Sequence, residues 1–171
     1  MGRTSNREKF LFDEFTEQAY RECLRLAKSR YHFIDYHHLN TPGRVCLWRH
    51  DIDTSPQRAL ALGKIEQEEG VASTCFFLLH CDRYNALDAQ TREVMHALQD
   101  LGHEIGLHFD PVYYGAKISG RQSMEELMAG ERDMLAEITG IPVKVFSFHN
   151  PSVNGMIEVG FDEMAGMVNA F

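Results

Sequence analysis

The chain has 171 residues, of which 44% are hydrophobic and 25% are charged. This composition is typical of a globular protein with one or two domains, and it excludes a disordered, collagen-like or disulfide-rich chain. Lysine and arginine total 17 against 25 aspartate and glutamate residues, so the formal net charge is −8. Because the charge is negative and no cluster of basic residues is present, we expect no binding to nucleic acid or to an anionic membrane surface.

The sequence shows no targeting or membrane segment. No apolar run has the length of a transmembrane helix, so we expect no membrane span. Residues 1–10 are polar and lack the apolar segment of a signal peptide. The four cysteines form no Cys-x-x-Cys pair, which argues against a thiolate metal site. Together these features favour a reduced, cytoplasmic setting.

We divide the chain into a lead-in region, residues 1–43, and a longer α/β domain, residues 44–171. In the lead-in region, apolar side chains recur at helical spacing over residues 8–30, which predicts one amphipathic helix. The longer domain alternates short apolar runs with helical patterns. We expect strands at 45–48, 72–79, 104–107 and 143–148, helices at 56–69, 88–101 and 123–139, and the start of a further strand at 168–171.

The alternation of strands and helices predicts the fold class. Strands that are apolar along their whole length are typical of a parallel sheet covered by helices. Right-handed crossovers then allow either an open doubly wound sheet or a β/α barrel. In both arrangements the active site lies at the carboxyl ends of the strands.

Each predicted strand brings a histidine to that edge of the sheet. The residues at the four strand ends are His50, Asp51 and Asp53, then His80, then His108 and Asp110, and finally His149 and Asn150. Imidazoles together with carboxylates are the ligand set of zinc and related divalent metals. Taken alone, any of these histidines is more commonly a surface or capping residue, and either aspartate can cap the helix at 56–69. Their convergence favours a metal site.

Asp51 and Asp53 leave one strand end in similar directions. One carboxylate can hold a divalent cation, while the other lies close enough to take a proton from water. A bound metal lowers the pKa of water to about 7, so a carboxylate can then act as the base. The pair therefore suits metal-assisted hydrolysis.

The segments RHDIDTSP, STCFFLL, GHEIGLHFD and VFSFHNPS, in this order, resemble the polysaccharide deacetylase superfamily of carbohydrate esterases. The resemblance implies an irregular β/α barrel. It also implies a hydrolase that removes acetyl groups from N-acetylated sugars or glycan precursors, at an amide bond that is not a peptide bond, with zinc as the first candidate metal. By the same resemblance, Asp51 is the general base and Asp53 and His108 bind the metal.

The sequence departs from the usual pattern of that family. Val112 stands where the family has a second metal-binding histidine, so we expect His149, or failing that Asp110, to complete the ligand set. No arginine follows the fourth strand to orient the base. The remaining polar residues at the strand ends are expected to bind substrate, namely His50, His80, Asp110 and Asn150.

The later strands of the family, and its late histidine that acts as general acid, have no counterpart here. We therefore expect an incomplete barrel, truncated at its C-terminus, or else a reduced domain that closes its sheet with a second copy. In either case the open side would expose Val143 and Val145 and favour self-association. A non-catalytic carbohydrate- or metal-binding relic of the same fold is the alternative to an enzyme.

Overall fold

The computed structural model describes residues 15–152 and 162–170. The helices in this part of the chain are α2 (Glu17–Lys28), α3 (Pro56–Glu68), α4 (Ala89–Asp100), α5 (Pro111–Tyr114) and α6 (Arg121–Thr139), with a short 3₁₀ helix, η2 (Gly115–Lys117). The strands are β1 (His32–Ile34), β2 (Val45–Leu47), β3 (Arg49–Ile52), β4 (Thr74–Phe77), β5 (Glu104–Phe109), β6 (Val145–Phe148), β7 (Glu163–Met164) and β8 (Met167–Asn169). Among the described helices, none is long and apolar enough to cross a membrane.

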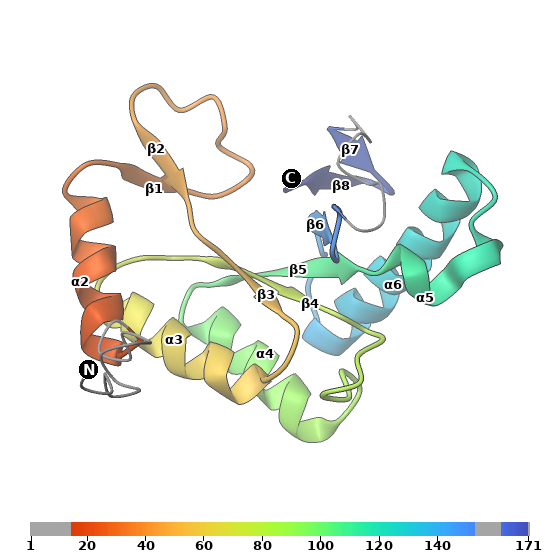
Figure 1. Cartoon of the computed structure of the whole chain (residues 1–171), viewed down its shortest axis with the longest axis horizontal. Coiled ribbons are helices and arrows are strands. Elements are labelled where there is room, and N and C mark those ends of the chain that lie inside the picture. Colours follow the sequence, from red (N-terminus) through yellow and green to blue (C-terminus); the bar gives the residue numbers. More distant parts are fainter. Residues whose placement is uncertain (1–14, 153–161, 171) are drawn as a thin grey trace, which may run out of the picture.

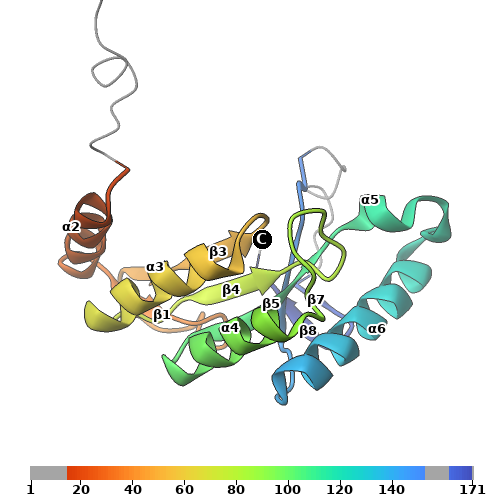
Figure 2. The same ribbon diagram turned by 90° about the horizontal axis from the view of Figure 1, so that it is seen from below.

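Six strands form one sheet in the order β3-β4-β5-β6-β8-β7 (Figure 1). Its neighbouring strands from β3 to β8 run parallel, whereas β7 pairs antiparallel with β8. In the view from below, α3, α4 and α6 lie side by side along one face of this sheet (Figure 2). A mainly parallel sheet with helical crossovers confirms the α/β class predicted from the sequence.

Most expected elements lie within a few residues of their predicted positions. The three helices of the longer domain are α3, α4 and α6, and α2 is the described part of the helix expected at 8–30; residues 8–14 lie outside the described residues. Ser55 is the N-cap of α3, and its Oγ accepts the Arg58 N–H at 3.3 Å. Asp51 and Asp53 are therefore not needed to cap this helix.

The strand predicted at residues 45–48 corresponds to β2, and a second strand, β3, follows it at once and belongs to a different sheet. β2 pairs in parallel with β1, and β3 enters the six-stranded sheet, with Trp48 between them. The Trp48 indole N–H donates to the Tyr20 hydroxyl on α2 at 2.9 Å, and its ring lies 5.7 Å from the ring of Phe33 on β1. These contacts join the lead-in region to the domain, around a small apolar core that includes Leu24.

Side chains on each strand alternate between the two faces of the sheet. The helix-facing side is apolar and buries, among others, Cys75, Phe77, Leu107, Phe146 and Phe148. The opposite side is called the inner face below. On it, the register places Asp51 opposite Phe76, Phe76 opposite Gly106, and His108 opposite Ser147.

The edge of β6 is covered. β8 pairs with β6 so that Val145 lies opposite Val168, and Tyr36 packs edge-on against Phe76 of the inner face. Val143 is 4% exposed and Val145 is 0% exposed. The prediction that both valines lie on an open side is therefore wrong, and the expected self-association loses the surface on which it rested. The local pattern indicated a strand near residue 168 but not its partner, because pairing depends on the path of the chain between the two strands.

Gly106→Ala is expected to destabilise the fold. A Cβ atom at this position would lie 2.6 Å from the Phe76 ring and 2.9 Å from Val145 Cγ2, and both side chains are buried. Overpacking of this kind commonly costs about 1–3 kcal/mol.

Gly130→Ala is the matched control for this substitution. Gly130 is exposed within α6, and a Cβ atom there meets nothing within 4 Å. Alanine in a helix interior is about 0.5–1 kcal/mol more favourable than glycine. In urea unfolding, the midpoint should therefore be lower than that of the wild type for Gly106→Ala and higher for Gly130→Ala. Two variants that unfold at the same midpoint would contradict the close packing of the inner face.

Candidate metal centre

Three side chains from separate strand ends meet at the carboxyl edge of the inner face. Asp53 follows β3, His108 is the penultimate residue of β5, and His149 follows β6. Asp53 Oδ1 lies 3.4 Å from His108 Nε2 and 3.4 Å from His149 Nδ1, and the two imidazole nitrogens are 3.2 Å apart. One ligand atom from each residue lies within 4.8 Å of the other two. The structure thus brings together the three residues that the sequence analysis placed around a metal.

The Oδ1 atom of Asp53 is buried and accepts no hydrogen bond within the described part of the chain. A buried carboxylate oxygen without a donor is costly, and a cation satisfies it. A carboxylate and two imidazoles are also a ligand set of catalytic zinc sites, in which three protein ligands leave one position open. The donor set therefore fits a divalent metal such as zinc.

His108 is held in one orientation by the strand beside it. Its side chain is 2% exposed, and Nδ1 lies 2.8 Å from Ser147 Oγ across the β5–β6 register. Burial lowers the pKa of His108 and so favours the neutral ring, although the charges of Asp51 and Asp53 oppose this. A proton on Nδ1, donated to Ser147, leaves the Nε2 lone pair facing Asp53, as metal ligation requires.

His149 is positioned by the backbone and by the residue that follows it. Its N–H donates to the Phe109 carbonyl at 2.8 Å, which extends the contact between β5 and β6 beyond the end of β6. Asn150 Nδ2 lies 2.8 Å from His149 Nε2, so in this orientation the amide donates and Nε2 accepts. Metal binding through Nδ1 requires the amide to flip, which brings its oxygen to Nε2 and places the ring proton there. Asn150, which was expected to bind substrate, thus contacts a candidate metal ligand.

Arg49 is a site residue that the sequence analysis missed. It points to the inner face two residues before Asp51, and its guanidinium forms an ion pair with the Asp51 carboxylate. It also donates to Ser147 Oγ at 2.7 Å and to the Ala170 carbonyl at 2.9 Å. No arginine after β6 is needed to orient Asp51, because Arg49 reaches it along the same strand. The available signal was strand alternation, since residues i and i+2 share a face.

His50 does not belong to this site. It lies next to Asp51, so its ring points to the helix-facing side, where Nε2 is 2.5 Å from Glu66 Oε1. Glu66 is fully buried and also accepts hydrogen bonds from the hydroxyls of Ser73 and Tyr20. Burial alone would raise the pKa of Glu66, but these contacts, led by His50, lower it. This placement corrects the prediction that His50 binds substrate, because adjacent residues of a strand face opposite sides.

A second polar cluster surrounds His80. The His80 ring stacks on Tyr113 with centroids 3.6 Å apart, and Nε2 lies 3.3 Å from the Tyr114 hydroxyl and 3.4 Å from Glu131 Oε1. The Tyr114 hydroxyl donates to Glu131 Oε1 at 2.7 Å. Glu131 belongs to α6 and is 4% exposed; its burial, aided by the charge of Asp110, raises its pKa to about 7. Local sequence patterns gave no sign of Tyr114 or Glu131.

One cavity of about 350 Å³ joins this cluster to the metal centre. Its lining includes Asp53, His80, Asp110, Tyr113 and His149. Asp110 is not one of the three converging residues, and its Oδ1 accepts the Val112 N–H at 2.9 Å and so caps α5. Of the residues expected to bind substrate, His80 and Asp110 therefore line the cavity that contains the metal centre.

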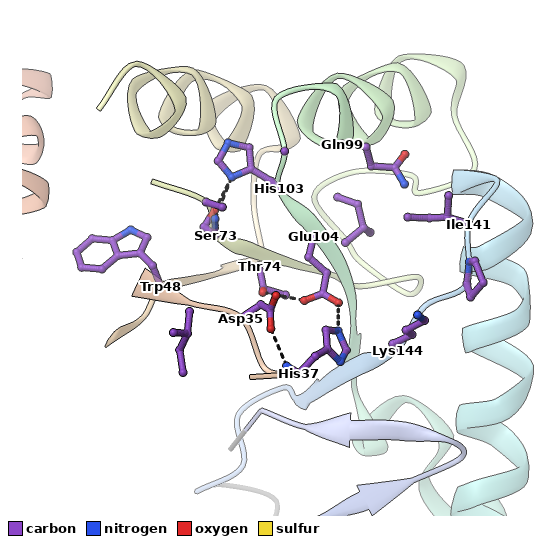
Figure 3. Close-up of a pocket in the computed structure, with 15 residues that line it drawn as sticks. Asp35, His37, Trp48, Ser73, Thr74, Gln99, His103, Glu104, Ile141 and Lys144 are labelled. Atoms are coloured by element: carbon purple, nitrogen blue, oxygen red, sulfur yellow. Dashed lines mark hydrogen bonds and ion pairs between the residues drawn. The ribbon is translucent and has the colours of Figure 1, made fainter. Parts of the chain in front are cut away.

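Another cavity, of about 520 Å³, opens at the opposite edge of the sheet, where β4 and β5 begin (Figure 3). Its polar residues pair with one another: Glu104 lies 2.6 Å from His37 Nε2 and accepts from Thr74 Oγ1 at 3.2 Å. In the described residues, the buried side-chain atom that lacks a hydrogen bond is Asp53 Oδ1, which lines the other cavity. The carboxyl edge is therefore the better candidate for a functional site.

No protein-family model matches the sequence, and no curated protein matches it. Solved structures do resemble it. The Streptococcus pyogenes deacetylase PplD, in complex with acetate, gives a TM-score of 0.60 at 10% identity, over 90% of this chain and 79% of that one. IcaB from Ammonifex degensii gives a TM-score of 0.58 at 14% identity, over 84% of this chain and 72% of that one.

A CE4 family pseudoenzyme from Bacillus anthracis, BA3943, is more distant, with a TM-score of 0.47 at 13% identity over 72% of this chain and 41% of that one. The likeness to PplD and IcaB shows that this chain shares their fold, and PplD is a deacetylase, in line with the deacetylase-like fold that the strand-end motifs predicted.

The purified chain is expected to bind zinc at Asp53, His108 and His149. Asp53→Asn and His149→Gln should each weaken binding at least about tenfold, since even residues that only support a metal ligand commonly contribute that much. Asp51→Asn should leave the affinity nearly unchanged, because it keeps the shape of a residue outside the ligand set. Titration calorimetry measures all three variants. If Asp51→Asn abolished binding and Asp53→Asn did not, the roles of the two aspartates would have to be exchanged.

Glu131 should make the stability of the fold depend on pH. Burial raises the pKa of its carboxyl from 4.5 in the unfolded chain to about 7. The folded state is therefore favoured below pH 4.5, and this advantage, on the order of 3 kcal/mol, is lost as the pH rises to about 7. Glu131→Gln keeps the shape without the titration, so it should gain stability relative to the wild type between pH 5 and pH 8. If the unfolding free energies of Glu131→Gln and the wild type differed by the same amount at pH 5 and at pH 8, the raised pKa of Glu131 would be contradicted.

Proposed function

We propose that this chain is a metal-dependent hydrolase that removes an acetyl group from an N-acetylated sugar or glycan precursor. The deacetylase fold supports this proposal. The observation that carries it is the buried Asp53 Oδ1 without a hydrogen bond, which lies 3.4 Å from two imidazole nitrogens, with Asp51 on the same strand end. The bond cleaved would be an amide bond that is not a peptide bond.

Asp53, His108 and His149 would hold the metal, with zinc as the first candidate. When bound, a divalent metal supplies Lewis acidity that polarises the acetyl carbonyl and lowers the pKa of water. Metal binding needs a neutral imidazole, which the lowered pKa of His108 favours.

Asp51 is the proposed general base. Arg49 contacts both the Asp51 carboxylate and Ser147 Oγ, and Ser147 Oγ contacts the buried His108 ring, so Asp51 belongs to the same hydrogen-bonded network as a candidate ligand. Arg49 engages Oδ1 of Asp51, and Oδ2 is the oxygen that would take the proton of the attacking water. By fixing the carboxylate, Arg49 would serve as a positioning residue, since a base must lie within hydrogen-bond reach of its proton.

The cavity beside the metal centre suits a carbohydrate. Carboxylates and a guanidinium from Asp82, Arg83 and Asp110 can bind hydroxyl groups, and the exposed Tyr113 ring can cover an apolar face of a sugar. We propose a glycan or glycan precursor in the cytoplasm as the substrate.

We also propose that the sheet is part of an irregular β/α barrel. β3 and β8 are four strand positions apart, which in a flat sheet is about 19 Å at the usual strand spacing. Arg49 of β3 nevertheless donates to the Ala170 carbonyl, directly after β8, at 2.9 Å. A single side chain cannot span the flat distance, so the sheet curls around the inner face.

The alternative is a non-catalytic, carbohydrate- or metal-binding relic of the same fold. It predicts that zinc binds but that no acetate is released. Incubating the zinc-loaded chain with N-acetylated oligosaccharides, and measuring acetate, separates the two proposals. Acetate release that stops on addition of a chelator and returns with zinc would support the enzyme.

Asp51→Asn is expected to remove most of this activity. Asparagine keeps the shape of the side chain but cannot accept the proton, and loss of a general base commonly lowers the rate by about 10²–10⁴. Asp100→Asn, at the exposed end of α4, is the matched control and should behave as the wild type. Equal rates of acetate release from all three proteins would rule out Asp51 as the base.

A further inference from the structure

We propose that His80, aligned by Glu131 and Tyr114, is the general acid that protonates the departing amine. This inference rests on the proposed function, and it assigns a catalytic role to a residue outside the candidate metal ligands. Amide hydrolysis needs such a group, because an amine anion is too basic to leave without a proton. His80 is a titratable group in the cavity beside the metal centre that is neither a candidate ligand nor the proposed base, and its ring contacts the buried Glu131 carboxylate.

The geometry presents one edge of the His80 ring for this task. Nε2 contacts the Tyr114 hydroxyl at 3.3 Å and Glu131 Oε1 at 3.4 Å, and the ring plane is fixed by stacking on Tyr113 at 3.6 Å with an angle of 7°. Within the described residues, Nδ1 of His80 makes no hydrogen bond. A ring held at one nitrogen by a buried carboxylate, with the other nitrogen available to substrate, is the arrangement of a positioned acid or base.

His80 and the metal centre can act on the same substrate molecule. His80, Asp53 and His149 all line the cavity of about 350 Å³. A cavity of this size lies at the lower end of the range for small-molecule sites, so a single N-acetylated sugar would contact both.

Burial and several charged groups act on the His80 ring. Burial lowers the pKa of His80, and the charge of Lys117 adds to this, while the charge of Asp110 opposes it. Glu131, with its pKa raised to about 7 by burial, faces the ring from α6. The other ionisable groups that line the same cavity are Asp53, Cys81, Asp82, Arg83, Tyr113 and His149.

The proposed reaction is hydrolysis of the amide bond between the acetyl group and the sugar nitrogen. A water oxygen forms a bond to the acetyl carbon, and Asp51 takes the proton that the water loses. The bond between the acetyl carbon and nitrogen breaks, and the nitrogen takes the proton from His80 Nδ1. The products are a free amine and acetic acid, which ionises to acetate; Asp51 then releases its proton to solvent, and His80 Nδ1 regains one from solvent.

Two substrates whose leaving groups differ in their need for a proton test the role of His80. His80→Gln should lower acetate release from an N-acetylated oligosaccharide by about 10²–10⁴, the usual contribution of a general acid. Hydrolysis of 4-nitrophenyl acetate, whose leaving group departs without a proton, should change little. His96→Gln, at an exposed position of α4, is the matched control and should leave both rates unchanged. Zinc content and the urea midpoint confirm that each variant is folded and loaded.

Glu131→Gln tests the positioning role of the carboxylate. Removing a negative charge beside His80 should lower the pKa of the ring, so the alkaline limb of the amide pH–rate profile should move to lower pH. The profile for 4-nitrophenyl acetate should stay in place. A purely structural clamp between His80 and α6 would instead lower both rates without moving either profile.

The outcomes separate this inference from the function on which it rests. Equal losses on both substrates, or no loss on either, in His80→Gln would overturn the general-acid role and leave the deacetylase proposal standing. A zinc-loaded wild-type chain that hydrolyses neither substrate would overturn the proposed function, and the role of His80 with it.

Discussion

The parallel register of β5 on β6 is the constraint on which the candidate metal centre depends. Ladder hydrogen bonds place His108 opposite Ser147, and the His149 N–H extends the contact to the Phe109 carbonyl at 2.8 Å. Because side chains alternate along a strand, a slip of one residue would turn a histidine toward the helices and bring an aromatic residue to the inner face. The hydrogen bonds and apolar packing that hold the sheet on α4 and α6 therefore also set the positions of the candidate ligands.

Arg49 ties that register to the rest of the inner face. From β3 it reaches Asp51 on its own strand, Ser147 on β6 and the Ala170 carbonyl after β8, and its guanidinium lies 4.6 Å from the centre of the Phe76 ring. Ser147 in turn contacts His108, so the proposed base and a candidate metal ligand share one hydrogen-bonded network. The chain after β7 thus contributes to the site through a backbone carbonyl, as well as covering β6.

The pKa values of two buried glutamates, Glu66 and Glu131, are shifted in opposite directions. Glu66 has contacts with the side chains of His50, Ser73 and Tyr20, and its pKa is lowered despite its burial. Among the residues that the structure describes, Glu131 contacts Tyr114 and His80, and burial raises its pKa to about 7. The first glutamate behaves as a stabilising element of the packing between α3 and the sheet. The second lowers stability as it ionises, which is the kind of cost that proteins retain beside functional sites.

By itself, the sequence determined the α/β class, the main strands and helices, and the gathering of Asp53, His108 and His149. It could do so because apolar periodicity is local and because the carboxyl ends of parallel strands meet at one edge. Only the tertiary structure decided which face of a strand each polar residue occupies and what covers the edge of β6. It also decided which distant residues, such as Glu131, reach the strand ends. These outcomes depend on register and on contacts between segments far apart in the chain, for which a local pattern carries no signal.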